Sequence, residues 1–207
     1  MMKHCSKILI MLFLIFNLSF PVIAQVQKLS VHAHTGVAHP QEKNIPAGLE
    51  TGFGFSLPLA KSLSLSFDFS YWNSTTEKQA GKLMAGKLEM APFLLTLEYF
   101  SFKENWVNPY LLCGAGFIFS SFKVGQYISI PEVTFRQKIE NGPAVLFGVG
   151  TTIRIVKNLF LFGEGKYLYR QAAGKTIITD MNLGTLTEEF SVNLSSFIFH
   201  LGARYFF

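Results

Sequence analysis

A two-residue alternation of large apolar and small polar side chains runs through most of this chain and limits the folds open to it. Residues 62–72 read SLSLSFDFSYW, so leucine, phenylalanine and tyrosine take one set of alternate positions, and mostly serine and aspartate take the other. Residues 46–57 and 141–155 show the same alternation. Successive side chains of a β-strand point to opposite faces, so the pattern predicts strands with one apolar and one polar face.

The alternation predicts eight strands, at about residues 27–38, 46–57, 62–72, 87–100, 106–120, 141–156, 159–170 and 190–207. The connections between them are alternately long and short, which places all the long ones at one end. After residue 24, no run approaches the roughly 18 apolar residues of a transmembrane helix. We therefore expect an all-β fold, an eight-stranded antiparallel up-and-down transmembrane β-barrel. The alternation changes phase near Pro92, which suggests a β-bulge there.

Composition indicates which face of the strands points outwards. Charged residues make up 15% of the chain and hydrophobic residues 49%, whereas a soluble domain has about 25% charged residues. A soluble lipocalin-like barrel would turn its polar face to water, but serine, glycine and threonine suit a crowded eight-stranded lumen better. The apolar face, which includes Cys113, is therefore predicted to face lipid. Aromatic girdles near the strand ends are predicted at Trp72, Tyr99, Trp106 and Tyr205.

Residues 1–24 have the features of a secretory signal peptide. A basic start with Lys3 and Lys7 precedes the apolar run 8–16, and the segment ends in Val-Ile-Ala, which suits a signal peptidase. Polar residues and a proline interrupt the run, which argues against the alternative of a single transmembrane anchor. We expect the chain to be exported, the signal to be cleaved, and residues 25–207 to form a barrel domain in the bacterial outer membrane.

The final strand ends HLGARYFF. Its polar residue, glycine and two aromatic residues resemble, in type and spacing, the C-terminal signal by which the outer-membrane assembly machinery recognises its substrates. The matching residues are His200, Gly202, Tyr205 and Phe207. The resemblance implies that the barrel-assembly machinery is a partner during biogenesis.

Residues 94–117 resemble the small barrels of the outer membrane protein W family. The shared features are an aromatic-ended strand, a short turn, then Pro109-Tyr110 followed by the Gly-Ala-Gly run at 114–116. The layout of residues 25–207 is also similar to the barrel domains of outer membrane proteins A and X. This resemblance implies an eight-stranded barrel and, for the W family, passage of small hydrophobic molecules.

Charged residues of both signs occur on the predicted lumen face. A buried charge needs a partner, and an eight-stranded lumen is narrow, so we expect them to form a charge-paired plug. The alternative is a polar conduction path. The residues of this predicted lumen network are Glu50, Asp68, Glu98, Arg154, Glu164, Lys166 and Arg204.

Three histidines lie on the same predicted face of the first and last strands, which barrel closure makes neighbours. Counting from the strand ends puts His200 at a depth similar to His32, with His34 nearby. Imidazoles in such a group can bind a transition metal or respond to protons. We expect ordinary hydrogen bonding in the lumen instead, with no metal, because no carboxylate is clearly positioned beside them.

The sequence favours a structural or permeability role without catalysis. Lipid A deacylases of this barrel type use a histidine and a serine two residues apart on one strand, and no histidine after residue 24 is followed by a serine two residues later. We therefore assign no catalytic residues and no cofactor. Two alternatives stay open: an outer-membrane lipid-modifying enzyme with an unrecognised site, and an adhesin that acts through its loops.

The formal net charge is +5, without the basic runs of a nucleic-acid-binding protein. The expected partners are outer-membrane lipid and lipopolysaccharide, whose phosphates some loop cations could contact as point charges. We expect a monomer. The cations in the long connections are Lys43, Lys78, Lys82, Lys123, Arg136, Lys138 and Lys175.

Overall fold

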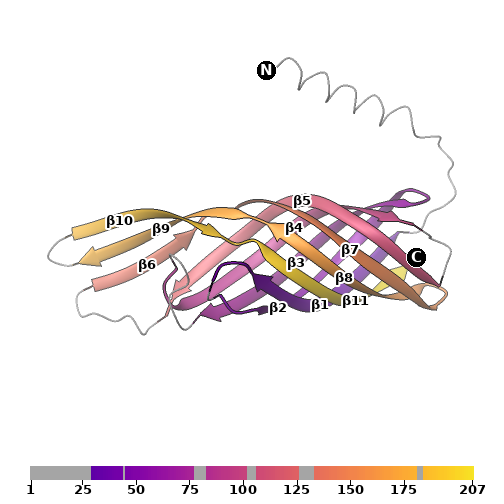
Figure 1. Cartoon of the computed structure of the whole chain (residues 1–207), viewed down its shortest axis with the longest axis horizontal. Coiled ribbons are helices and arrows are strands. Elements are labelled where there is room, and N and C mark those ends of the chain that lie inside the picture. The colour runs from indigo at the N-terminus through magenta and orange to yellow at the C-terminus, as the bar shows by residue number, and fades with distance from the viewer. Residues whose placement is uncertain (1–28, 44, 77–82, 102–105, 126–132, 181–183) are drawn as a thin grey trace, which may run out of the picture.

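The computed structural model describes residues 29–43, 45–76, 83–101, 106–125, 133–180 and 184–207, and their regular structure is β-sheet (Figure 1). None of these residues belongs to a helix with the length and hydropathy needed to cross a membrane. The predicted signal peptide, residues 1–24, lies outside the described ranges. The barrel strands are β1 (Ser30–Pro40), β2 (Gly48–Ala60), β3 (Leu63–Thr76), β4 (Gly86–Phe100), β5 (Val107–Val124), β7 (Gly142–Val156), β8 (Leu159–Tyr169) and β11 (Ser196–Phe206).

These eight strands form a closed antiparallel barrel in the order β1-β11-β8-β7-β5-β4-β3-β2. Strands β1 and β11 pair along their whole length, from Ser30 opposite Phe206 to Pro40 opposite Ser196, and this seam closes the barrel. The predicted eight-stranded up-and-down barrel is confirmed. Closure pairs the edges that an open sheet would leave exposed.

Three more strands lie within the long connections: β6 (Val133–Ile139), β9 (Gln171–Asp180) and β10 (Gly184–Asn193). They form a separate antiparallel sheet in the order β10-β9-β6, here called the extension sheet. It projects beyond the barrel at the end opposite the C-terminus (Figure 1).

The predicted strand at 190–207 is wrong at its beginning. Residues 190–193 belong to β10, and β11 begins at Ser196, because the extended strand structure is interrupted at residues 194 and 195. At this break, the backbone N–H of Leu194 donates to the Arg170 carbonyl, and that of Ser195 donates to the Asn193 side chain. Most of β10 is exposed on both faces, so it lacks the apolar–polar alternation that marks the barrel strands.

The predicted bulge at Pro92 is also wrong. Phe69 pairs with Phe93 and Trp72 with Met90, so the register between β3 and β4 holds across this position. Inward and outward positions alternate along all of β4. The sequence pattern changes because the inward face itself changes from polar, at Glu98, to apolar, at Met90. The register shifts that do occur lie between Pro58 and Ala60 and between Arg154 and Val156.

The interior next to the extension sheet is filled by buried apolar side chains, here called the apolar cap. Trp72 is one of them and is fully buried, so its predicted place in an outer aromatic girdle is wrong. It occupies the same face of β3 as Asp68, which points inwards. The other three predicted girdle residues are exposed. The apolar cap consists of Trp72, Leu88, Met90, Ile118, Phe122, Leu146, Leu168 and Ile198.

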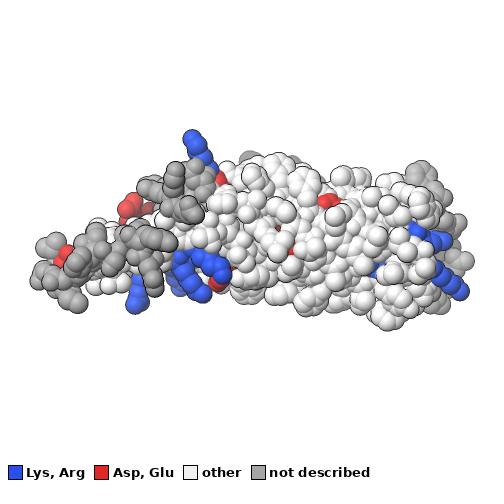
Figure 2. Space-filling view, turned by 90° about the horizontal axis from the view of Figure 1, so that it is seen from below, with Lys and Arg blue, Asp and Glu red and all other residues white. Residues whose placement is uncertain are grey.

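The outside of the barrel is covered by exposed leucine, valine and phenylalanine side chains, and Cys113 is exposed among them. On the face shown in Figure 2, nearly all lysine, arginine, aspartate and glutamate side chains lie toward the two ends, with an almost uncharged band between them. This confirms that the apolar face of the strands points outwards. An apolar band flanked by polar ends is the surface expected of a barrel in a bilayer.

Candidate functional site: the charged lumen

Strand alternation brings the charges of the polar face into the middle of the barrel. Six of the seven predicted lumen residues are buried: Glu50, Asp68, Glu98, Glu164, Lys166 and Arg204. Arg154 is only partly buried, and its guanidinium carbon lies 5.4 Å from the centre of the Phe160 ring. Four of these six residues form ion pairs with one another, Glu98 with Arg204 and Glu164 with Lys166, whereas Arg154 packs against an aromatic ring.

Arg204 and Glu98 form the strongest pair. Arg204 Nη1 and Nη2 donate to the two carboxylate oxygens of Glu98 at 2.8 and 2.7 Å. This is the two-point geometry in which guanidinium and carboxylate fit best. The residues come from β11 and β4, which are not neighbours in the barrel, so the pair crosses the lumen.

Glu164 is the centre of a second group. Lys166, two residues further along β8, places its Nζ 2.5 Å from Glu164 Oε2. The Tyr110 hydroxyl, from β5, donates to Glu164 Oε1 at 2.6 Å. Tyr110 entered the sequence analysis only as part of a family motif, although its inward position follows from the alternation of β5.

The three histidines meet, as predicted, but in a different order. The register puts His32 opposite Arg204 and His200 opposite Gly36, so His34 lies between the other two. The rings of His34 and His200 stack with their centroids 4.2 Å apart, and those of His32 and His34 are 6.2 Å apart. The prediction that His200 and His32 lie at similar depth is wrong, because it did not include the stagger between β1 and β11.

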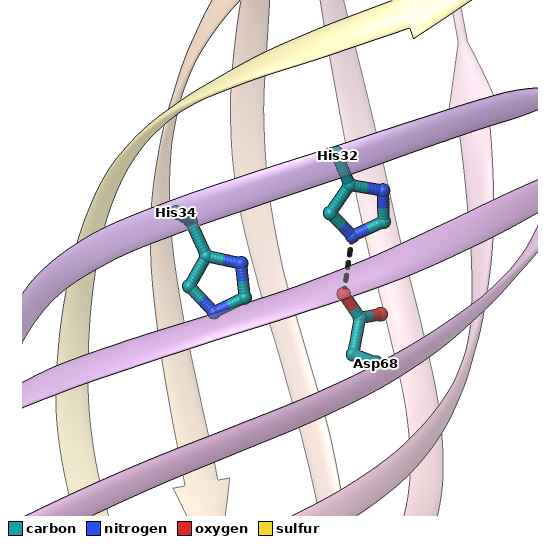
Figure 3. Close-up of side chains that lie close together, drawn as sticks. All are labelled: His32, His34 and Asp68. Carbon is teal, nitrogen blue, oxygen red and sulfur yellow. Dashed lines mark hydrogen bonds and ion pairs between the residues drawn. The ribbon is translucent and has the colours of Figure 1, made fainter.

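Carboxylates lie directly beside these histidines, contrary to the sequence-based expectation. His32 Nε2 lies 2.6 Å from Asp68 Oδ1, a hydrogen bond that reaches from β1 to β3 (Figure 3). His200 Nε2 lies 3.1 Å from Glu50 Oε2, and its Nδ1 lies 3.8 Å from Glu164 Oε2. Every imidazole and every carboxylate in this group is buried.

Two glycines on β2 explain how the β1 imidazoles reach so far across the lumen. Gly52 and Gly54 face His34 and His32 in the register between β1 and β2. A Cβ at Gly52 would lie 2.4 Å from His34 Nε2, and one at Gly54 would lie 2.6 Å from His32 Nε2. A side chain at either position would occupy the space of an imidazole, so the two glycines leave room for the imidazoles to extend over β2.

Arg170 is a buried charge that the sequence analysis missed. It follows β8 at the junction with the extension sheet, in phase with the inward positions of that strand. Its Nη1 donates to Ser120 Oγ at 2.7 Å, and its Nη2 donates to the Glu140 carbonyl at 2.6 Å. Arg170 thus ties β8 to β5 and to the end of β6.

No protein family and no curated protein matches this sequence. Solved structures do match the fold. A major outer membrane protein from Thermus thermophilus is 17% identical, with 88% of this chain and 100% of that one covered and a TM-score of 0.62. Neisserial surface protein A is 15% identical, with 86% and 97% covered and a TM-score of 0.58. The Escherichia coli outer membrane protein W is 13% identical, with 89% and 100% covered and a TM-score of 0.51.

The chain has the fold of the small outer-membrane barrels. The barrel that the resemblance to outer membrane protein W implies is thus confirmed at the level of fold. Within this small barrel, His200 and Gly202 of the predicted assembly signal point inwards, whereas Tyr205 and Phe207 are exposed. Their recognition by the assembly machinery stays a prediction.

Two of the predicted loop cations of this small barrel, Lys123 and Lys175, are held in ion pairs. Lys123 Nζ lies 3.6 Å from Glu89, which also pairs with Lys87 at 2.8 Å. Lys175, in the extension sheet, lies 3.0 Å from Glu189, whose hydrogen bond and charge raise the pKa of Lys175. Two of the cations, Lys78 and Lys82, lie outside the described residues. Contact with lipopolysaccharide stays a prediction.

Proposed function

We propose that this protein is an integral barrel of the bacterial outer membrane with a structural role, closed to ions and polar solutes and without catalytic activity. The observation that carries the proposal is the Glu98–Arg204 pair, which crosses the lumen with two hydrogen bonds. An eight-stranded lumen is just wide enough for side chains to fill it. A bridge across the lumen, near the C-terminal ends of β4 and β11, leaves little room for a continuous water path.

The rest of the interior supports the same proposal. The pair of Glu164 and Lys166 and the histidine group occupy the lumen beside the bridge. The apolar cap fills the interior towards the extension sheet with buried side chains. A hydrated ion would have to displace both the charged lumen groups and the apolar cap. Separating the buried charges would leave each without its partner.

Conductance in planar bilayers tests this closure. The refolded protein should produce no unitary current steps at either sign of applied voltage. A general porin, inserted from the same detergent under the same salt, serves as the positive control. Reproducible steps from the wild-type barrel would contradict the closed lumen and favour the polar conduction path.

A second candidate function is sideways passage of small hydrophobic molecules. Strand β5 pairs with β7 as far as Ile118, which lies opposite Gly142. Beyond that point, in the described ranges, residues 119–124 pair with β4 on one side and have no paired strand on the other. A pocket of about 500 Å³ lies between this free edge and β6. Together with the apolar cap, it supports a path that leaves the barrel through its wall when the Arg170 bridge between Ser120 and Glu140 parts. The pocket is lined by residues 120–122 and 137–141.

A disulfide clip across this gap tests the second candidate. The backbone N–H of Ser120 donates to Asn141 Oδ1 at 2.8 Å, so the two residues are adjacent. In a Cys113→Ala background, the pair Ser120→Cys and Asn141→Cys should form a disulfide on oxidation. We expect the oxidised clip to slow entry of a hydrophobic fluorophore into expressing cells, and a reducing agent to restore the rate. Equal rates in both states would rule out this exit.

A further inference from the structure

Five buried metal-ligating side chains meet at the seam that closes the barrel. His32 and His34 come from β1, Glu50 from β2, Asp68 from β3 and His200 from β11. Their donor atoms fall into two groups, each with all donors within 4.8 Å of one another: His34, Glu50 and His200, and His32, His34 and Asp68. His34 belongs to both groups.

The first group has donor atoms without a well-aligned hydrogen bond, although Glu50 and His200 lie at ion-pair distance. Among the described residues, His34 Nε2, Glu50 Oε2 and both ring nitrogens of His200 are buried and lack a hydrogen bond of good geometry. His200 Nδ1 is turned towards Glu164, whereas one donor atom from each of His34, Glu50 and His200 lies within 4.8 Å of the other two. Buried polar atoms in native proteins nearly always have a partner, so this grouping indicates a shared ligand. In the second group, by contrast, His32 and Asp68 already satisfy each other at 2.6 Å.

The charge of the lumen points to a cation. Among the described lumen residues, four buried carboxylates, those of Glu50, Asp68, Glu98 and Glu164, face two buried cations, Lys166 and Arg204. Glu98 is neutralised by Arg204, and Glu164 by Lys166. In the part of the chain that the structure describes, the ion-pairing partners of Glu50 and Asp68 are imidazoles. A buried carboxylate is costly unless a positive charge compensates it. A divalent cation would balance the two.

We propose that His34, His200 and Glu50 bind a divalent transition-metal ion, for which zinc is the best match. Two imidazoles and one carboxylate form a common protein ligand set for zinc. Donor atoms around a tetrahedral zinc ion lie about 3.3 Å apart, close to the 3.1 Å between His200 Nε2 and Glu50 Oε2. The His34 and His200 rings stack at 4.2 Å, so one of them would turn out of the stack to bring its donor atom to the same ion.

The surroundings of His200 match those of a metal-binding histidine. When its Nε2 holds the ion, its Nδ1 faces Glu164 at 3.8 Å, and Glu164 is itself held by Tyr110 and Lys166. A carboxylate behind the second ring nitrogen is the usual way in which a protein orients such a ligand. Glu164 is therefore a positioning residue for this site.

The ion would have to enter before the barrel closes. His34 and His200 lie on opposite sides of the seam between β1 and β11, and the finished lumen is filled around them. The test therefore adds metal during folding. The untagged mature chain is refolded in detergent with zinc chloride, passed over a chelating resin, and assayed for retained metal by atomic emission.

We expect the wild type to retain roughly one zinc ion per chain. The double variant His34→Ala, His200→Ala should lose it. Glu164→Gln should retain zinc with about 10–100-fold weaker affinity. His39→Ala is the matched control, because His39 is an exposed histidine on the same strand, and it should retain the wild-type amount. Folding of each variant is checked by its faster gel mobility before heating.

Two results would overturn the proposal. Wild-type protein that retains no zinc would mean that protonated histidines alone balance the carboxylates. Equal retention by the double-alanine variant would mean that the ion lies elsewhere. If the variants do not fold, X-ray absorption of the zinc-loaded wild type decides the matter. Imidazole scattering around the zinc is expected, and a shell of oxygen atoms alone would refute the site.

Discussion

Replacing Glu98 with alanine should lower the free energy of unfolding by about 3–5 kcal/mol. The change removes the carboxylate that, within the described part of the chain, lies at hydrogen-bonding distance from the buried Arg204 guanidinium. The aromatic rings of Tyr110 and Phe162, whose centres lie 5.9 and 5.4 Å from the guanidinium carbon, cannot replace a paired charge. Water has little access to the site, so the charge stays uncompensated.

The measurement is equilibrium unfolding in denaturant with the protein in lipid vesicles. Glu89→Ala is the matched control on the same strand, because Glu89 pairs with two partly exposed lysines and should cost about 1 kcal/mol or less. The double variant Glu98→Leu, Arg204→Met should recover most of the stability, since it removes both charges. A Glu98→Ala cost no larger than that of Glu89→Ala would contradict the buried bridge.

A charge on the outer face of the barrel should lower the free energy of unfolding nearly as much as the Glu98→Ala change. Leu201 is 72% exposed and lies at the sixth of the eleven residues of β11, near the middle of the barrel wall. In a bilayer this position is close to the midplane, where arginine costs about 2–4 kcal/mol. Leu201→Arg should therefore destabilise the barrel in vesicles, although the leucine side chain is already exposed.

The extension sheet supplies the control for this prediction. Leu186 is 65% exposed on β10, beyond the barrel, where water would surround it. Leu186→Arg should change the free energy of unfolding by less than about 0.5 kcal/mol. If both variants are equally stable in vesicles, the apolar band does not face lipid, and the membrane assignment is wrong.

The barrel could be predicted from sequence because its strands carry a strong local pattern. Leu63, Phe67 and Phe69 alternate with Ser66 and Asp68, and one such strand is enough to define two faces. The pattern fails where both faces share one environment. In β10 both faces are exposed, and at residues 90–95 of β4 both are apolar, so neither the extension sheet nor the absence of a bulge at Pro92 could be read from it.

The lumen site was only partly predictable for a different reason. Which residues point inwards follows from alternation, and closure brings β1 beside β11, so the meeting of His34 and His200 was foreseeable. Which residues touch depends on the stagger of each strand pair, and stagger has no clear local pattern. The contact of His32 with Asp68 also requires Gly54 between them, a three-strand arrangement that appears only in the folded barrel.

The seam between β1 and β11 also sets how this chain must fold. Ser30 pairs with Phe206, so the contacts that complete the barrel join residues near opposite ends of the sequence. Contacts of such large sequence separation form slowly, because the entropy of closing the intervening loop is lost before the contacts form. Until β11 arrives, β1 keeps a row of unpaired backbone groups that could pair with another chain. The unfinished barrel is therefore the state of this protein most prone to aggregation, and the one in which a chaperone would have the most to protect.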